Sequence, residues 1–332
     1  MELITGENDK GRRLDRILRK ALPDCPLPLI HRLLRQKKVL VDGKPHKAND
    51  RIDEGITISI PSLNAADQGF KIKERGLEAV DRFVKPEILW EGMGLVAVNK
   101  PAGVAVHGDN SLDTIVRSYL IDKLTPSLSF APGPLHRLDK PSSGIVVFSS
   151  GLEGARLFTS LMREQKIKKT YLAVIEGKLE KEEIWQDELL RDKEMKKTFV
   201  ANKIRNTPHK NKTKTAITKV TPLSFNGECT LIKAQIATGR THQIRAQAAS
   251  HGYPLLGDVK YGAKKTGNKE YKIRNKENVE FFLHAWKLEF LDVKIEAPLP
   301  QTRMPIASLI ASTSVFLSGS LPEIPGISTS NG

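Results

Sequence analysis

Cysteine is nearly absent from this chain, since its 332 residues include only Cys25 and Cys229, which lie far apart and outside any CxxC pair. This scarcity argues against a disulfide framework and against a cysteine zinc site, so each thiol is expected to be a small buried residue. Long apolar runs are missing too, and the opening MELITGENDK lacks the cationic-then-apolar pattern of a secretion signal. We therefore expect a cytoplasmic protein without a membrane span.

The common catalytic signatures are missing as well. The chain contains no glycine-rich phosphate loop with a lysine, no HExxH and no GxSxG. The glycines of GDVKYG and ATGRTHQIR are not at dinucleotide-binding spacing, and His136, His242 and His284 are not at metal-ligand spacing. We therefore expect no nucleotide cofactor and no metal.

Positive charge, by contrast, is abundant and unevenly spread. The formal net charge is +15, and the isoelectric point is near 9.7. Residues 10–51 contain 13 Lys/Arg against four Asp, a net +9, and residues 191–219 contain ten Lys/Arg against two acids, a net +8. Basic clusters of this kind are typical of proteins that bind a polyanion, and we expect nucleic acid.

The first sixty residues have the pattern of a small basic module. Apolar residues recur at helical spacing within 13–22 and again from Leu29, Asp42–Gly43 indicates a tight turn, and 56–60 alternates as a strand. Residues 61–86 carry weak periodicity and mixed charge, which predicts a linker. The candidate nucleic-acid contacts of the module are Arg12, Arg13, Arg32, Arg35, Lys37 and Lys38.

From residue 87 onward, strand patterns outnumber helical ones. The predicted strands include LVAVNK, GIVVFS, YLAVIEG, KTAITKV and CTLIKAQIA, with helical patterns at SLDTIVRSYLIDKL and GLEGARLFTSLMREQ. Strands and helices seldom alternate one for one, which favours an α+β fold over a doubly wound one. We expect one large domain over 87–312 and a loose Ser/Pro/Gly-rich tail over 313–332.

Short polar islands adjoin the predicted strands, and the densest is HRLDKPSSG, residues 136–144. Taken alone, it is either a surface turn before a buried strand or a loop that presents the carboxylate of Asp139 for chemistry. The other islands are NKPAGVAVH, KKTYLAVIEG, TGRTHQIR, GDVKYG and LHAWKLEF. Together they supply arginines, a tyrosine and few acids, which fits nucleophilic or general-base work by Asp139 with a nearby cation. Arg137 and Lys140 are both possible charge partners.

The islands resemble, in the same order, the motifs of the RluA-type pseudouridine synthases, whose usual signature is HRLDxxTSG. The resemblance covers roughly residues 88–292, and residues 1–60 resemble the small RNA-binding domain named after ribosomal protein S4. It implies a mixed, mainly antiparallel pseudouridine synthase fold behind a small N-terminal α/β RNA-binding domain. The reaction implied is isomerisation of uridine to pseudouridine in RNA, which needs no cofactor.

The resemblance also implies roles for individual residues. Asp139 matches the catalytic aspartate, which attacks either the sugar or the base. Tyr171 matches the tyrosine that stacks on the uracil and is implicated in proton removal, and Arg245 matches the basic residue that pairs with the aspartate. Arg137 matches the arginine that holds the place of the flipped-out nucleotide. Further candidates for binding RNA or substrate are His136, Arg240 and His242.

Three departures and several alternatives accompany the resemblance. Pro141, Ser142 and Gln247 stand where the family commonly has an acidic or polar residue, threonine and histidine, but none of them removes a proposed catalytic group. The expected substrate is large-subunit (23S) ribosomal RNA, with transfer RNA as the nearest variant, and the chain is expected to be a monomer. A non-catalytic RNA-binding or ribosome-assembly protein is the rival from another class, and a metal-free hydrolase using Asp139 and His136 is a third.

Overall fold

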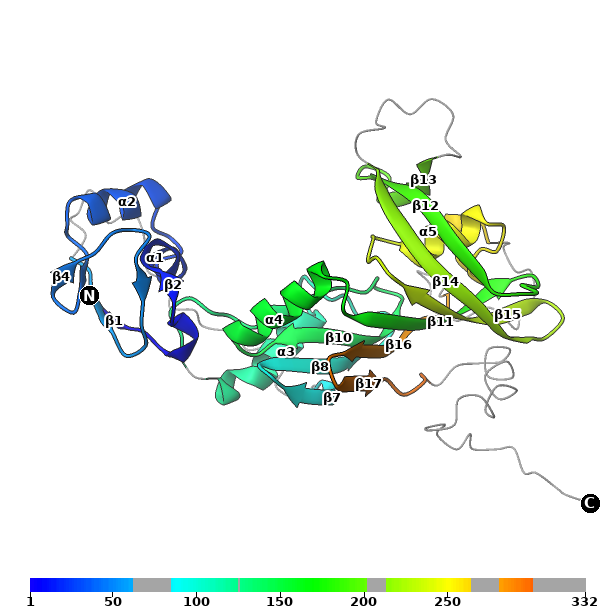
Figure 1. Cartoon of the computed structure of the whole chain (residues 1–332), viewed down its shortest axis with the longest axis horizontal. Coiled ribbons are helices and arrows are strands. Elements are labelled where there is room, and N and C mark those ends of the chain that lie inside the picture. Colours follow the sequence, from blue (N-terminus) through cyan, green and yellow to red (C-terminus); the bar gives the residue numbers. More distant parts are fainter. Residues whose placement is uncertain (62–84, 125, 202–212, 264–280, 301–332) are drawn as a thin grey trace, which may run out of the picture.

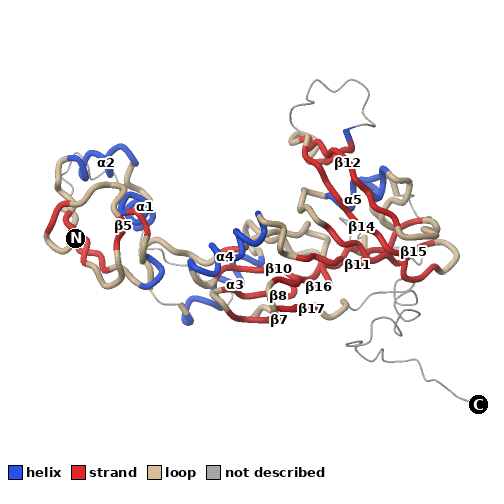
Figure 2. The backbone as a smooth tube through the Cα atoms, viewed as in Figure 1, coloured by secondary structure: helices blue, strands red, loops and turns tan. Residues whose placement is uncertain are grey.

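The structure is a computed structural model that describes residues 1–61, 85–124, 126–201, 213–263 and 281–300. A small domain at the N-terminal end adjoins one end of a long twisted sheet (Figures 1 and 2). Most of the predicted linker 61–86 and the whole predicted tail 313–332 lie outside the described residues, so the proposed domain boundaries stay predictions. Within the described part of the chain, no helix has both the length and the apolar composition to cross a lipid bilayer.

Two helices packed on short strands form the N-terminal domain. The predicted helices are confirmed, and their apolar faces make a core that contains Leu14, Ile17, Ile30 and Ile58. The strands form a four-stranded sheet of order β1-β6-β3-β4 and a separate pair, β2-β5. The elements are β1 Glu2–Ile4, β2 Arg12–Arg13, α1 Leu14–Ala21, α2 Leu27–Arg35, β3 Leu40–Val41, β4 Lys44–Pro45, β5 Arg51–Ile52 and β6 Thr57–Ser59.

The rest of the described chain is built on one 11-stranded sheet. The main order of its strands is β13-β12-β14-β15-β11-β16-β10-β8-β7, with β17 beside β16 and β9 beside β10. Every pairing is antiparallel except β10 with β16, which agrees with the expected mainly antiparallel α+β fold. The strands are β7 Glu87–Gly92, β8 Leu95–Lys100, β9 Gly133–Pro134, β10 Ser143–Ser149, β11 Lys168–Glu176, β12 Glu183–Asp192, β13 Lys197–Val200, β14 Lys214–Phe225, β15 Cys229–Ile236, β16 Leu283–Phe290 and β17 Val293–Glu296.

Helices cover both faces of this sheet. Alternation along β10 sends Val146 and Phe148 toward α3 (Leu112–Leu120), while Ile145 and Val147 pack with Phe158 of α4 (Leu152–Arg163). A third helix, α5 (Gln243–Ser250), follows β15. The pattern of continuous apolar runs in β8 and β10 is thereby explained, because both faces of these strands are buried.

Strands β10 and β16 approach closely just beyond the HRLDKPSSG turn. Gly144 lies opposite Ala285 in this parallel pair and has a φ of +104°, and a Cβ placed on it would lie 2.3 Å from the Ala285 carbonyl oxygen. Glycine is therefore required at this position. The contact anchors the turn that carries Asp139 to the middle of the sheet.

The N-terminal domain is fastened to the rest of the chain by the buried carboxylate of Asp9. That carboxylate accepts hydrogen bonds from the backbone N–H groups of Leu128 and Ser129, both at 2.9 Å, and from the hydroxyls of Ser127 and Ser129. Burial by itself raises the pKa of Asp9, but these hydrogen bonds, led by that from Ser129, more than offset it and leave the pKa below its usual value. The Leu128 side chain packs against the N-terminal core. The connection is therefore both polar and apolar.

Candidate active site

Asp139 lies in the turn between β9 and β10, with about 17% of its side chain exposed. The N–H of Ser142 donates to the Asp139 carbonyl at 3.1 Å and closes the turn. The neighbouring carbonyl of Lys140 accepts hydrogen bonds from the Gly103 N–H at 2.9 Å and from the Lys100 ammonium at 3.1 Å. The NKPAG segment therefore supports the turn that presents the carboxylate.

Lys100 is fully buried beneath this turn. Besides Lys140, its Nζ donates to the carbonyls of Pro101 at 2.9 Å and Val104 at 2.7 Å, so all three of its hydrogens are used. Burial lowers the pKa of Lys100 to about 8, against the opposing effect of the Asp139 charge. Lys100 thus places a positive charge behind Asp139 and ties two motifs together.

Arg245 of α5 pairs with Asp139 across the site. Its Nη1 lies 3.0 Å from Asp139 Oδ2, while its Nε and Nη2 bind the two oxygens of the buried Asp258 at 2.7 and 2.9 Å. The expected pairing of Arg245 with the aspartate is therefore present in the structure. Arg245, and not Arg137 or Lys140, contacts the Asp139 carboxylate. Arg137 and Lys140 are both exposed.

The guanidinium of Arg245 is enclosed by aromatic rings as well as by carboxylates. Its central carbon lies 4.3 Å from the ring centre of Phe281 and 4.8 Å from that of Tyr261. Burial acts to lower the pKa of Arg245, but hydrogen bonds and charge from Asp258 and Asp139 more than offset it and raise the pKa. The cation is therefore permanent and fixed in orientation.

His242 approaches the second oxygen of Asp139. Its Nε2 lies 3.6 Å from Asp139 Oδ1, and its Nδ1 lies 2.7 Å from the Tyr261 hydroxyl, which also accepts the Thr198 N–H at 2.9 Å. These contacts are all satisfied when the tyrosine donates to Nδ1 and the proton resides on Nε2, facing the carboxylate. Burial lowers the pKa of His242 to about 4, so the ring is neutral at pH 7.

Tyr171 lies near the start of β11, next to a bulge in its pairing with β16. Its side chain is 9% exposed and packs in the same apolar cluster as Leu138, one residue before Asp139. Burial raises the pKa of Tyr171, and the nearby charge of Asp139 raises it further. The phenol is therefore neutral at physiological pH, and it can stack on a base and donate a hydrogen bond.

The remaining predicted contacts occupy varied positions. Arg137 is exposed beside Asp139, and the Nε of the exposed Arg240 donates to the Thr215 carbonyl. In the N-terminal domain, Arg12 and Arg13 already have protein partners, Ser129 and Asp15. Arg32 and Arg35 occupy exposed positions of α2, and Lys37 and Lys38 are exposed just after it.

The surroundings of His136 are those of a structural side chain. Its Nε2 accepts the Val147 N–H at 3.1 Å, and its ring stacks on Phe158 with a centroid separation of 6.0 Å. Burial, together with the positive charge of Lys169, lowers the pKa of His136 to about 3. A neutral ring held in this way braces the turn. That His136 contacts the substrate stays a prediction, and its Nε2 and its ring already have partners within the protein.

Several side chains that organise the site were not assigned a role from the sequence. Asp258 and Tyr261 belong to the GDVKYG island and Lys100 to the NKPAG island, so the islands marked their neighbourhoods without revealing their partners. Gln247, a departure from the family pattern, is fully buried and joins Thr218 of β14 to Asp187 of β12. Its amide thus ties α5 to two neighbouring strands of the sheet.

The Asp139 carboxylate lies between the fixed cation of Arg245 and the neutral imidazole of His242, in the same neighbourhood as the buried Tyr171. This arrangement is suited to chemistry on a nucleobase inserted among these groups. Known proteins share the fold. The solved structure of Human RNA Pseudouridylate Synthase Domain Containing 4 matches this one with a TM-score of 0.54. The two sequences are 23% identical, and the match covers 65% of this chain and 89% of the human chain. Human RNA Pseudouridylate Synthase Domain Containing 1 is 21% identical with a TM-score of 0.52, over 68% and 87%. The fold is therefore that of the pseudouridine synthases.

Sequence comparisons are more specific. Residues 94–250 match the RNA pseudouridylate synthase family, and residues 12–58 match the S4 domain. Ribosomal large subunit pseudouridine synthase C of Buchnera aphidicola (subsp. Baizongia pistaciae) is 30% identical over 314 residues, which span 88% of this chain and 92% of the relative. The protein of the same name from Escherichia coli K12 is 28% identical over 301 residues, 89% and 91% of the two chains. The chain belongs to the RNA pseudouridylate synthase family and is an RNA-modifying isomerase.

Proposed function

We propose that the protein converts specific uridines of large-subunit ribosomal RNA to pseudouridine, with Asp139 as the catalytic aspartate. The observation that carries the proposal is the 3.0 Å contact between Asp139 and Arg245, in which a doubly anchored cation orients a partly exposed carboxylate. The substrate class is supported by relatives named as ribosomal large subunit pseudouridine synthases, which align over about nine-tenths of both chains.

The proposed reaction begins with extrusion of the target nucleotide, because a base stacked in folded RNA cannot reach a partly buried carboxylate. Tyr171 then stacks on the uracil, and the Asp139 carboxylate attacks the sugar or the base while the bond between N1 and the sugar breaks. The uracil turns, C5 bonds to the sugar and loses its proton, and the bond between Asp139 and the substrate breaks, which regenerates the free carboxylate. N1 gains a proton, so the atoms balance without a redox partner.

The polar side chains around this centre are proposed to hold the RNA. Arg137 and Arg240 are exposed, and His242 contacts the carboxylate. In the N-terminal domain, exposed cations on α2 and just after it supply phosphate contacts. These cations are Arg32, Arg35, Lys37 and Lys38. Arg12 and Arg13 contribute charge beside them. A cytoplasmic location and a monomeric state are further predictions.

The decisive experiment combines a variant with pseudouridine mapping. Ribosomal and transfer RNA from cells with and without the gene are mapped for pseudouridine, and the missing sites are restored in vitro with the purified wild-type chain. Asp139→Asn should abolish conversion and leave RNA affinity within about twofold, because the amide keeps the size of the carboxyl group but not its charge. Sites lost only from transfer RNA would redirect the substrate assignment. Conversion by Asp139→Asn at the wild-type rate would refute the catalytic assignment.

A further inference from the structure

Arg16 and Arg156, from two other elements, lie near enough to Arg12 for their charges to act on it where the N-terminal domain joins the large sheet. Arg12 follows the Asp9 segment, Arg16 lies on α1, and Arg156 lies on α4. Arg12 Nη1 donates to the Ser129 carbonyl at 2.9 Å. Burial lowers the pKa of Arg12, and the charges of Arg156 and Arg16 lower it further against the effect of Asp9. Like charges gathered in this way repel one another, so a polyanion laid across them would be stabilising.

The junction holds these arginines in a fixed arrangement. Asn8 Oδ1 accepts the N–H of Leu152, the first residue of α4, at 2.8 Å. The backbone of α4 also approaches the β7–β8 turn so closely that a Cβ on Gly154 would lie 2.2 Å from the Gly94 carbonyl oxygen. The Asn8 bond and the buried bonds of Asp9 therefore fix the start of α4 against the N-terminal domain, and the Gly154 contact fixes it against the large sheet.

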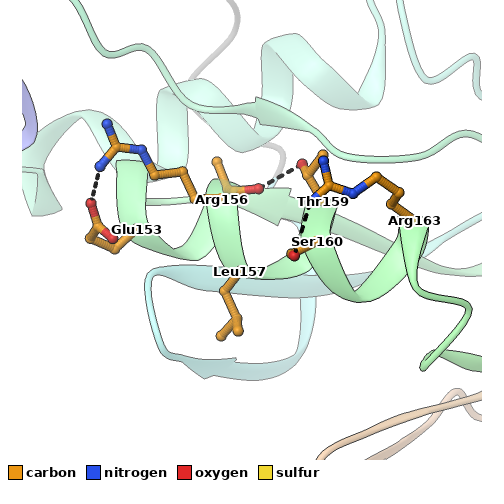
Figure 3. A pocket seen from close by; sticks show the side chains of 7 residues that line it. Glu153, Arg156, Leu157, Thr159, Ser160 and Arg163 are labelled. Atoms are coloured by element: carbon orange, nitrogen blue, oxygen red, sulfur yellow. Dashed lines mark hydrogen bonds and ion pairs between the residues drawn. The ribbon is translucent and has the colours of Figure 1, made fainter.

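The outward face of α4 continues from this junction. Figure 3 shows Arg156 and Arg163 on that face with Thr159 and Ser160 between them, while Leu157 points away. These residues line a shallow hollow. The two arginines are seven residues apart, about two helical turns or roughly 10 Å. The contacts of Arg156 with Glu153 and of Arg163 with Ser160 are exposed, and such pairs exchange readily for a phosphate.

The far end of α4 reaches the neighbourhood of the active site. Lys169 of β11 contacts Met162 of α4, with Nζ 2.8 Å from the sulfur. A Cβ on Gly239 would lie 3.8 Å from the same Nζ, which places Lys169 beside the Gly239–Arg240 turn that precedes α5. A cation therefore stands at each stage between the N-terminal domain and the turn that leads to His242.

We propose that the outward face of α4, through Arg156 and Arg163, binds the phosphate backbone of the RNA between the N-terminal domain and the active site. This inference rests on the proposed function, because it assigns a path to the same substrate. Guanidinium groups suit phosphate, and they supply the donors here, because the hydroxyls of Thr159 and Ser160 already donate to the Ala155 carbonyl and to Glu164. The rigid junction means that one RNA must satisfy the N-terminal domain, α4 and Asp139 together, so α4 helps to select which uridine reaches the site.

The test is the salt dependence of binding to an unmodified large-subunit ribosomal RNA transcript. The double variant Arg156→Gln/Arg163→Gln is compared with Lys178→Gln/Lys181→Gln, which removes the same charge from exposed positions after β11. Loss of two phosphate contacts should reduce the slope of log affinity against log salt by about two and weaken binding roughly tenfold in 50 mM salt, whereas the control should retain the wild-type slope.

Equal slopes for the two double variants would overturn the proposal, because the effect would then be one of net charge and not of contact. Circular dichroism of both variants checks that α4 remains folded. Pseudouridine formation by the wild-type chain is measured on the same transcript. If the wild type modifies the transcript and the α4 variant keeps its slope, the path is wrong and the proposed function stands. If the wild type modifies no uridine there, the proposed function itself fails.

Discussion

Arg245 uses one nitrogen for Asp139, at 3.0 Å, and its other two for Asp258, at 2.7 and 2.9 Å. Asp258, which is buried more deeply, thus orients Arg245, and Arg245 in turn orients the partly exposed Asp139. Because the guanidinium is planar and rigid, the two anions are held in a fixed mutual geometry. Asp258 is therefore a positioning residue for Asp139.

Removing the charge of Asp258 should impair turnover more than binding. Asp258→Asn keeps the shape but weakens two charge-assisted hydrogen bonds, each worth about 1.5–3 kcal/mol, so kcat should fall roughly 10- to 100-fold. The dissociation constant for RNA should change less than threefold, because Asp258 is only 2% exposed and so cannot touch the RNA backbone. Single-turnover rates and binding isotherms separate the two quantities. Asp292→Asn, at an exposed turn, is the matched control. A tenfold loss of affinity with an unchanged rate would contradict this role.

The hydroxyl of Tyr171 and its ring should make separable contributions. Tyr171→Phe keeps the stacking surface and should retain RNA affinity within about threefold, whereas Tyr171→Ala should lose roughly 1–3 kcal/mol of binding to RNA that contains the target uridine. If the hydroxyl takes part in proton removal, Tyr171→Phe should fall in rate by about 100-fold. Because burial and the charge of Asp139 raise the pKa of Tyr171, the wild-type rate should show no titration of this phenol between pH 6 and 9. Wild-type rates for Tyr171→Phe would leave stacking as its sole role.

Three neutral histidines should make the fold sensitive to acid. Burial lowers the pKa of His136 to about 3 and of His242 and His284 to about 4, whereas the same groups titrate near 6.5 when unfolded. The unfolded chain then binds more protons below pH 6.5. Stability is therefore complete above that value and is lost as the pH falls toward 4. The protonation of each histidine in the unfolded chain should lower the free energy of unfolding by about 1–2 kcal/mol between pH 7.5 and pH 5.

His136→Gln separates this effect from carboxylate titration. The glutamine oxygen can still accept the Val147 N–H, but the side chain no longer binds a proton. Denaturant unfolding at pH 7.5 and 5.0 should show a loss of stability smaller by about 1–2 kcal/mol in the variant than in the wild type. His107→Gln, at an exposed position, serves as the control and should behave like the wild type. An identical loss in all three proteins would mean that His136 takes up its proton in the folded state.

Local pattern accounts for much of what could be predicted. The helices of the N-terminal domain follow from apolar residues at helical spacing, and β8, β10 and β15 from short apolar runs. Strands β12 and β13 were not predicted, because their residues mix charge with apolar side chains; they pair with each other across a short turn, and β12 also pairs with the more distant β14. Their partners, and not their own periodicity, make them strands.

The sequence by itself determined the positive charge, the α+β character, the resemblance to pseudouridine synthases and the identity of Asp139 as the residue to examine. Only the tertiary structure decided which groups surround that aspartate. Arg245 is 106 residues away along the chain, and Asp9 meets Ser129 across 120 residues. Periodicity and propensity act over one or two turns of chain, whereas these contacts depend on how whole elements pack. That packing made His136 a brace, Asp258 an anchor and α4 a neighbour of the RNA-binding domain.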